Sequence, residues 1–264
     1  MNTTKTNLKF DLQRSKNYYE NRAINGPAMV RSTFMSSDLY KKVFYSTRIN
    51  KIKKLLDIKP KDKVLEIGCG EGYYTEQIGA ITSNLIATDI SQNYLDKARL
   101  RNPHSIIDYI CCPAEKLPFN DNFFEKILMS EVIEHLIDWR QGIKEAKRVL
   151  KPGGKLIITT PNKHSYLNFL THFKTIVRNS STKVEHIKEF SGKELKTILK
   201  KHFFVESFFC VNYFPVLLPE FLSKIIGFQR IKNIVRGVEN FFNKIPIIRG
   251  AGLIIITSVI KPDE

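Results

Sequence analysis

The chain has 264 residues, of which 42% are hydrophobic and 26% are charged, a composition that excludes a disordered or fibrous protein. Its formal net charge of +16 suits nucleic acid, an anionic membrane or an acidic substrate, but a lysine-rich soluble surface would give the same value. Because no run of about 18 apolar residues occurs, we expect no membrane-spanning helix.

The cysteines and the first residues of the chain indicate in which cellular compartment the protein is expected. Two of the four cysteines, Cys111 and Cys112, are adjacent and no CxxC occurs, which favours reduced thiols over a disulfide framework. The N-terminus lacks the apolar stretch of a signal peptide. We therefore expect a cytoplasmic protein, with peripheral attachment to a membrane as the alternative.

Residues 1–62 precede the first predicted strand and are expected to form a helical extension. The first thirty-odd residues show no clear pattern and are predicted to be irregular. The stretch SSDLYKKVFYSTRINKIKKLLDI then offers an N-cap at Ser37 or Asp38, followed by apolar residues at helical spacing. It predicts one or two helices that lead into the sheet.

Residues 63–212 alternate apolar runs of strand length with segments of helical spacing, which is typical of βαβ units and a parallel sheet. A helix is expected to end at Leu150, and the glycines at 153 and 154 predict a turn before the next strand. Polar residues 162–190 predict a long connection, and Ser191 predicts the cap of a further helix. The predicted strands are 64–67, 85–87, 106–111, 124–129, 155–160 and one within FFVESFFCVNYF.

Residues 213–251 are too many for a hairpin loop and are predicted to be an insertion before a final strand in 252–264. From Phe221 onward apolar residues recur at helical spacing among lysines and arginines, which is typical of a basic amphipathic helix. We interpret this segment as a lid or part of the core. A dimer face in a homo-oligomer and a surface that lies on an anionic membrane are the alternatives.

The segment VLEIGCGEG is the most informative, because an apolar strand runs into closely spaced glycines and a helical pattern follows at once. Glycines at such a turn let the backbone approach a ligand closely. The spacing is G-x-G-x-G, not the G-x-G-x-x-G of dinucleotide binding, and Glu66 before the first glycine would repel a pyrophosphate. A cationic ligand that carries an amino acid is compatible with both features.

Asp89 ends the second predicted strand, about 20 residues beyond the glycines, where a carboxylate can accept hydrogen bonds from both hydroxyls of a ribose. A tight glycine turn followed by a helix-capping aspartate is the simpler structural interpretation. The position of both features after successive strands favours the ribose.

Together with CPAEKLPFNDNFFEKILMSEVIEHL and EAKRVLKPGGKLIITTPN, this arrangement resembles the class I S-adenosylmethionine-dependent methyltransferases, and within them the ubiquinone-biosynthesis O-methyltransferase group. The resemblance is good over about residues 63–162, extends loosely to Leu199 and leaves both ends of the chain unmatched. It implies an α/β fold with a Rossmann-like, doubly wound, seven-stranded sheet, mostly parallel with an antiparallel last strand. It also implies S-adenosylmethionine as the cofactor.

The same resemblance assigns roles around the cofactor. At Pro113 the chain departs from the family, which often has an acid there that accepts from the adenine amino group. Backbone groups or Glu115 are then expected to recognise adenine. The implied residues are the loop Gly68, Cys69, Gly70 and Gly72 with Glu66 at the methionine end, Asp89 at the ribose, Ile90, Ala114 and Glu115 at the adenine, and Ser130 and Glu131 at the methionine part.

The spacing in SEVIEHL would place Glu131, Glu134 and His135 on one face of a helix that begins where a strand ends. Three interpretations are open. The glutamates can simply stabilise a helix N-terminus. His135, with Glu134, can act as general base, since imidazole accepts protons near neutral pH.

The third interpretation is a divalent cation, Mg²⁺ or a similar ion, that orients a hydroxyl of the acceptor. Small-RNA 2′-O-methyltransferases share the E-x-x-E-H pattern and add a remote histidine, which the resemblance places at His186 rather than at His164. The expected ligands are Glu131, Glu134, His135 and His186.

The expected reaction is transfer of a methyl group to an oxygen of a small-molecule or lipid-linked acceptor, such as a prenylated quinone precursor. An RNA 2′-O-methyltransferase with a divalent metal and an N- or C-methyltransferase are the alternatives. Nucleic acid is disfavoured, because no RNA-binding module occurs and no basic patch is interleaved with aromatic residues outside the amphipathic segment. A catalytically silent scaffold is disfavoured by the intact glycine loop and Asp89.

Overall fold

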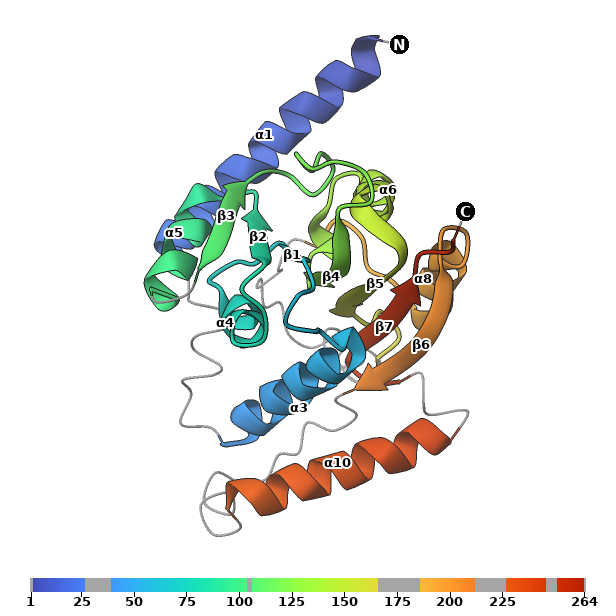
Figure 1. Cartoon of the computed structure of the whole chain (residues 1–264). Coiled ribbons are helices and arrows are strands. Elements are labelled where there is room, and N and C mark those ends of the chain that lie inside the picture. The colour runs from blue at the N-terminus through green and yellow to red at the C-terminus, as the bar shows by residue number, and fades with distance from the viewer. Residues whose placement is uncertain are drawn as a thin grey trace, which may run out of the picture.

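The computed structural model describes residues 2–26, 39–103, 106–165, 186–211, 227–245 and 251–263, and its centre is a seven-stranded sheet of order β3-β2-β1-β4-β5-β7-β6 (Figure 1). Neighbouring strands are parallel except that β7 runs antiparallel to β5 and β6. This is the doubly wound, Rossmann-like, seven-stranded sheet that the family resemblance implied, and it confirms that expectation. The elements are α1 (Asn2–Asn25), α3 (Leu39–Leu56), β1 (Val64–Ile67), α4 (Tyr73–Gly79), β2 (Leu85–Asp89), α5 (Gln92–Arg101), β3 (Ile107–Cys111), β4 (Phe124–Ser130), the 3₁₀ turn η1 (Ile133–His135), α6 (Trp139–Val149), β5 (Leu150–Pro161), α8 (Gly192–Leu199), β6 (Phe204–Val211), α10 (Phe228–Lys244) and β7 (Ile254–Ile260).

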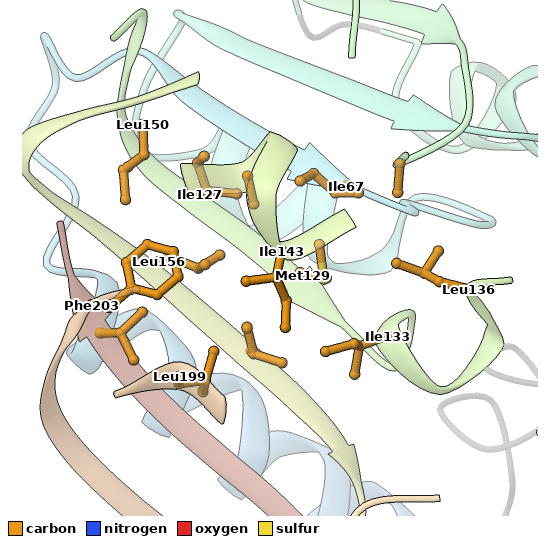
Figure 2. Packing of buried hydrophobic residues seen from close by; sticks show 14 of the residues in the cluster. Ile67, Ile127, Met129, Ile133, Leu136, Ile143, Leu150, Leu156, Leu199 and Phe203 are labelled. Carbon is orange, nitrogen blue, oxygen red and sulfur yellow. The ribbon is translucent and has the colours of Figure 1, made fainter. Parts of the chain in front are cut away.

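Helices bury apolar side chains on both faces of the sheet. Side chains of α6 and α8 share one buried cluster with Ile127 and Met129 of β4 (Figure 2). Leu128, between them in the strand, belongs instead to a second cluster with α3 and α4. Successive side chains of a strand point to opposite faces, so a strand covered on both sides is apolar at consecutive positions. This explains why the central strands were visible in the sequence as unbroken apolar runs.

The start of β5 differs from the prediction, which placed a turn at the two glycines and the strand after it. The strand begins at Leu150, directly after α6. Gly153 adopts φ +70°, its N–H donates to the carbonyl of Lys261 at 2.9 Å, and the N–H of Lys261 donates to Gly154 at 3.0 Å. The glycines are therefore paired with the chain that leaves β7. The predicted cap at Ser191 is confirmed, since its Oγ accepts from the N–H of Glu194 at 3.2 Å.

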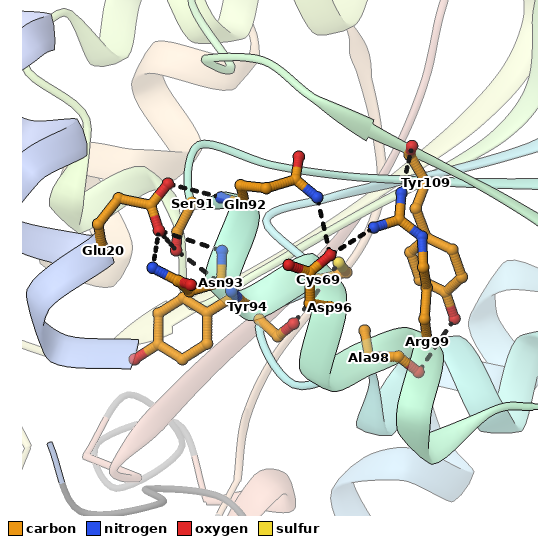
Figure 3. A network of polar contacts seen from close by, with 11 residues as sticks. Glu20, Cys69, Ser91, Gln92, Asn93, Tyr94, Asp96, Ala98, Arg99 and Tyr109 are labelled. Atoms are coloured by element: carbon orange, nitrogen blue, oxygen red, sulfur yellow. Dashed lines mark hydrogen bonds and ion pairs between the residues drawn. The ribbon is translucent and has the colours of Figure 1, made fainter. Parts of the chain in front are cut away.

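The prediction of an irregular N-terminus was wrong, because residues 2–25 form the long helix α1 beside α5 (Figure 1). A polar side chain attaches it. The Glu20 carboxylate accepts from the Ser91 hydroxyl at 2.8 Å, from the N–H of Gln92 at 2.8 Å, and from the N–H and the side-chain amide of Asn93 at 3.1 and 2.6 Å (Figure 3). Because a polar side chain makes this attachment, the sequence of α1 shows little of the apolar periodicity by which surface helices are recognised.

The Glu20 carboxylate occupies the N-terminus of α5, where backbone N–H groups lack partners within the helix and the helix dipole favours negative charge. Burial raises the pKa of Glu20, but the hydrogen bonds from Asn93, Ser91 and Gln92 outweigh burial and hold the pKa below its ordinary value. The ionised carboxylate is therefore the form that attaches α1 to α5.

Of the predicted insertion at 213–251, the structure describes α10, which lies against α3 (Figure 1). Ile231 is buried, whereas Ile234 and Phe241 are exposed. Phe221, where the amphipathic pattern begins, and Ser37 and Asp38, the predicted caps of α3, lie outside the described residues. The lid, dimer and membrane interpretations of the insertion stay predictions. Among the helices described, none has both the length and the apolarity that crossing a bilayer requires.

Replacing Glu20 by Gln is expected to loosen α1 without unfolding the domain. An amide cannot match the charge-assisted hydrogen bonds of the carboxylate, and for a partly exposed group the loss is about 1 kcal/mol. Amide hydrogen exchange in residues 11–25 should become about fivefold faster, while the central strands keep their protection. Asp11→Asn, at an exposed position of the same helix, is the control, and equal exchange in both variants would contradict the docking role.

Candidate functional site

A cavity of about 620 Å³ opens at the carboxyl ends of β1, β2 and β4, which is where open parallel sheets bind their ligands. Its volume is in the range of pockets that hold cofactors and drug-sized molecules. Side chains of α1 and α3 also line it. The lining comprises Leu12, Ser15, Tyr19, Arg22, Tyr45, Arg48, Ile67, Gly68, Cys69, Gly70, Glu71, Tyr73, Tyr74, Asp89, Ile90, Tyr94, Cys112, Ala114, Glu115, Ser130, Glu131, Val132, Glu134, His135, Leu136 and His186.

The glycine loop after β1 forms one wall of this cavity. The N–H groups of Gly68 and Cys69 both donate to the carbonyl of Thr88, at 2.8 and 2.9 Å, which fixes the loop against β2. Gly68 has φ +70°, and a Cβ there would stand 2.3 Å from a methyl of Val132. Gly70 also has positive φ, and a Cβ there would meet no atom within 4 Å. The loop therefore leaves open space at the cavity wall next to Gly70.

Asp89 joins this loop to the start of the next helix. One carboxylate oxygen accepts from the N–H of Gly70 at 2.9 Å, and the other accepts from the N–H of Ser91 at 3.0 Å. Burial raises the pKa of Asp89 to about 6, although these backbone hydrogen bonds oppose the rise. The side chain thus presents a buried carboxylate with remaining acceptor capacity to the cavity.

Most of the residues that the resemblance assigned to the cofactor line the cavity. Glu66 and Gly72 are exceptions, since neither lines the cavity, and their assignment to the cofactor stays a prediction. Glu66 lies beneath the loop, where its carboxylate accepts from the Thr75 hydroxyl at 2.6 Å and burial raises its pKa to about 8. Gly72 precedes α4, and a Cβ there would stand 2.9 Å from the Cβ of Ala98. The predicted residues in the lining are Gly68, Cys69, Gly70, Asp89, Ile90, Ala114, Glu115, Ser130 and Glu131.

Around Pro113, where the family often has an acid, the cavity is lined by Cys112, Ala114 and Glu115. One oxygen of the Glu115 carboxylate accepts from the N–H of Ile137 at 3.2 Å. Burial raises the pKa of Glu115, against backbone hydrogen bonds that lower it. Glu115 therefore holds the chain after η1 in place and is also positioned to contact a ligand.

The prediction of a helix from Glu131 was wrong. Glu131 adopts φ +57°, and only the single 3₁₀ turn of η1 follows. The carboxylate of Glu131 accepts from the Thr159 hydroxyl at 2.9 Å and lies 3.6 Å from the guanidinium of Arg48. The three-residue face that helical spacing implied does not form, because the left-handed residue Glu131 breaks the helical path at its first position.

Glu134, His135 and His186 nevertheless come together, through the backbone. The carbonyl of Glu134 accepts from the N–H groups of Ile187 and Lys188, at 2.8 and 3.1 Å, which ties residues 186–188 to η1. The imidazole rings of His135 and His186 then lie 5.1 Å apart between centroids. One potential ligand atom from each of the three side chains lies within 4.8 Å of the others, and in the described part of the chain Glu131 is not a member of this group.

Glu134 is 1% exposed, and within the described residues one of its two carboxylate oxygens has no hydrogen-bond partner. That oxygen lies 4.0 Å from Nε2 of His135, while the other accepts from the Thr160 hydroxyl at 2.9 Å. Burial raises the pKa of Glu134 well above its ordinary value, and the carboxylate of Glu131 adds to the rise. His164, the other histidine considered, is exposed and absent from the cavity lining.

Sequence reasoning missed the residues that α1 and α3 contribute. Arg48 is 5% exposed, its Nε donates to the Tyr74 hydroxyl at 2.6 Å, and it pairs with Glu131. The ring of Tyr19 meets the His135 ring edge to face, with centroids 5.9 Å apart. A buried arginine paired with a cavity-lining acid marks a functional site, but its partners are 26 and more residues away in the chain. No local pattern could identify it.

The comparisons with known proteins agree with this geometry. Residues 65–158 match the family described as "Methyltransferase domain". The chain carries a class I S-adenosylmethionine-dependent methyltransferase domain. The matched segment runs from β1 to β5 and so includes the glycine loop, Asp89 and η1.

Curated relatives include two enzymes whose names refer to quinones. The demethylmenaquinone methyltransferase of Corynebacterium urealyticum is 34% identical over 122 residues, which are 46% of this chain and 51% of that protein. The ubiquinone biosynthesis O-methyltransferase of Bradyrhizobium diazoefficiens is 33% identical over 104 residues, 39% of this chain and 41% of that protein. The alignments thus cover about half or less of these relatives' length.

A solved structure that resembles the chain is the N-methyltransferase NodS of Bradyrhizobium japonicum in complex with S-adenosyl-L-homocysteine. The two share a TM-score of 0.55 and 16% identity over 83% of this chain and 88% of NodS. At that identity the likeness shows the fold alone, and the acceptor must be inferred from this chain's own residues.

The methyltransferase domain's cavity fits S-adenosylmethionine. The open space at Gly70 allows close approach to the backbone, and the buried Asp89 carboxylate is a suitable acceptor for ribose hydroxyls. If the cofactor binds as the resemblance implies, Ile90 and Ala114 would supply apolar surface for the adenine ring, and Glu131 and Ser130 would supply acceptors for the amino-acid group. These residues would hold the cofactor.

Binding of S-adenosylhomocysteine is expected to weaken below pH 6. The ionised form of Asp89 accepts two hydroxyls, whereas its raised pKa of about 6 leaves it protonated as the pH falls. Between pH 8 and pH 5 the dissociation constant, measured by calorimetry, should rise about tenfold for this single proton. Asp89→Asn should bind weakly and without this pH dependence. If Asp89→Asn showed the same pH dependence as the wild type, the dependence would belong to another group, such as Glu66.

Proposed function

We propose that the protein transfers a methyl group from S-adenosylmethionine to an oxygen atom of a small-molecule or lipid-linked hydroxyl compound. The observation that carries this proposal is the imidazole of His135 at the edge of the cofactor cavity, beside the buried carboxylate of Glu134. A hydroxyl must lose its proton when its oxygen is methylated, so a proton acceptor at this place serves oxygen chemistry. The name of the ubiquinone biosynthesis O-methyltransferase supports an oxygen acceptor, and that of the demethylmenaquinone methyltransferase supports a quinone-related compound as the acceptor.

When bound, the cofactor supplies an electrophilic methyl carbon on a sulfonium, and the C–S bond that breaks leaves a neutral thioether. The acceptor oxygen forms the new C–O bond, and His135 takes the proton of the hydroxyl. Tyr19 packs its ring against His135 and Glu134 adjoins its Nε2, so both restrict the orientation of the imidazole. Side chains of α1 and α3, among them Tyr19 and Arg48, line the cavity and would help to align the reactants, an effect that can contribute several kcal/mol.

The second candidate is methylation of an RNA 2′-hydroxyl with a divalent cation. The unpartnered oxygen of Glu134 among the two histidines favours it, because carboxylate and imidazole are common ligands of Mg²⁺-like and transition-metal ions respectively. Glu134, His135 and His186 would hold the ion, which would lower the pKa of a hydroxyl and orient it. Glu131, expected as a fourth ligand, is engaged by Arg48 and Thr159 instead.

A substitution at His135 tests its role as base. His135→Asn keeps a polar side chain of similar length but accepts no proton, so kcat should fall by about 10²–10⁴. The measurement is transfer of labelled methyl from S-adenosylmethionine to a panel of phenols, catechols and hydroquinones. Affinity for S-adenosylhomocysteine should change less than about twofold. Wild-type transfer to amines but to no hydroxyl compound would contradict the oxygen proposal.

Metal dependence separates transfer with His135 alone as base from transfer assisted by a cation. If His135 acts alone as base, EDTA leaves transfer unchanged, and His186→Asn lowers kcat only a few-fold. If Glu134, His135 and His186 hold a cation, EDTA and His186→Asn both abolish transfer, and Mg²⁺ or Mn²⁺ restores only the wild type. Calorimetric titration of Mn²⁺ gives a readout independent of activity, in which His164→Asn is the matched control.

A further inference from the structure

A second cavity, of about 810 Å³, lies between α6 and α8 and shares no lining residue with the cofactor cavity. We call it the basic groove. Its walls are the outward-facing residues of the two helices and the chain on either side of α8. The lining comprises Trp139, Arg140, Ile143, Lys144, Lys188, Ser191, Lys193, Glu194, Thr197, Ile198, Lys201 and His202.

Positive charge in the basic groove is largely unneutralised. Glu194 is the one acid of the lining, and it pairs with Lys188 at 2.7 Å. The other cations of the lining, two on each wall, form no ion pair within the described ranges and are exposed; they are Arg140, Lys144, Lys193 and Lys201. Burial lowers the pKa of His202, and Lys147, Lys144 and Lys201 lower it further. Cations that face one another across a groove without counter-charges form a binding site for an anion.

The shape of the basic groove restricts the kind of anion. A planar membrane surface cannot enter the space between two helices. The single tryptophan, Trp139, has the guanidinium of Arg140 over its ring at 4.2 Å, and its ring meets Phe190 edge to face at 5.5 Å. Arg140 thus occupies one face of the Trp139 ring and Phe190 packs against the ring, which disfavours the stacking of a base on which recognition of single-stranded nucleic acid depends. Phosphate groups without stacked bases match these walls best.

The basic groove and the cofactor cavity are built from the same two chain segments. Residues 134–136 line the cavity and residues 139–140 line the groove, while His186 lines the cavity and Lys188 the groove. The Glu134 carbonyl holds these segments together through the N–H groups of Ile187 and Lys188. α6 follows β4 and α8 follows β5, and the carboxyl ends of these parallel strands lie at the same edge of the sheet, where Asn162 after β5 also bridges Phe190 before α8.

We propose that the basic groove binds the phosphates of the methyl acceptor, which is then a small-molecule or lipid-linked compound that carries a diphosphate. Two cations on each wall suit the several negative charges of a diphosphate better than the charge of a monophosphate. The hydroxyl end of the same molecule reaches His135. This inference rests on the proposed methyl transfer and names the chemical class of its acceptor.

The test uses the fluorescence of Trp139, which lines the basic groove and has no other tryptophan to obscure it. Wild-type protein is titrated with inorganic pyrophosphate at low ionic strength, and in parallel with a single-stranded RNA decamer. The double variant Lys144→Gln/Lys193→Gln removes one exposed cation from each wall of the groove. It leaves Arg140 in place over the ring of Trp139. The matched control is Lys54→Gln/Lys61→Gln, which removes two exposed lysines from α3 and the turn after it.

The expected result is a saturable fluorescence change with pyrophosphate whose dissociation constant rises at least tenfold in Lys144→Gln/Lys193→Gln and less than twofold in the control. Absence of saturation, or equal affinity in the two variants, would overturn the site. Tighter binding of the RNA than of pyrophosphate at equal phosphate concentration would overturn the diphosphate assignment in favour of nucleic acid. Calorimetry with S-adenosylhomocysteine should be unchanged in both variants, which separates failure of this inference from failure of the methyltransferase proposal.

Discussion

The carboxylate of Asp89 holds together the two loops on which the cofactor end of the cavity depends. It accepts from Gly70 in the loop after β1 and from Ser91 at the start of α5, so the carboxyl ends of two neighbouring strands are tied by one side chain. The next step outward is Glu20, which accepts from Ser91, Gln92 and Asn93 and places α1 over the cavity. The glycine loop after β1 and the helix α1 are therefore parts of one hydrogen-bonded network.

At the acceptor end of the cavity, a backbone contact holds two chain segments together. The Glu134 carbonyl brings residues 186–188 against η1, so two histidines that lie far apart in the chain meet beside a buried carboxylate. The same contact aligns the chain that continues into the basic groove. Methyl transfer needs alignment and exclusion of water more than it needs reactive side chains, which makes these positioning contacts central to the chemistry.

The sequence predicted the sheet well, because strands covered on both faces are apolar at consecutive residues such as Ile127 and Leu128. It also predicted the glycine loop, Asp89 and the approach of His186 to His135. It failed for α1, since a helix attached through Glu20 lacks an apolar stripe, and for the helix at Glu131, since a positive φ at a non-glycine residue leaves no local signal. Arg48 and the basic groove depend on contacts between distant segments.

The most direct measurement is a crystal structure of the protein with S-adenosylhomocysteine. We predict the ribose hydroxyls at the Asp89 carboxylate, the amino-acid end at the backbone of Gly68 and Gly70, and the sulfur on the side of the cavity that His135 lines. A ligand bound elsewhere, with the cavity closed by Tyr19 or Tyr74 and the Asp89 carboxylate free of contact with it, would contradict the central claim.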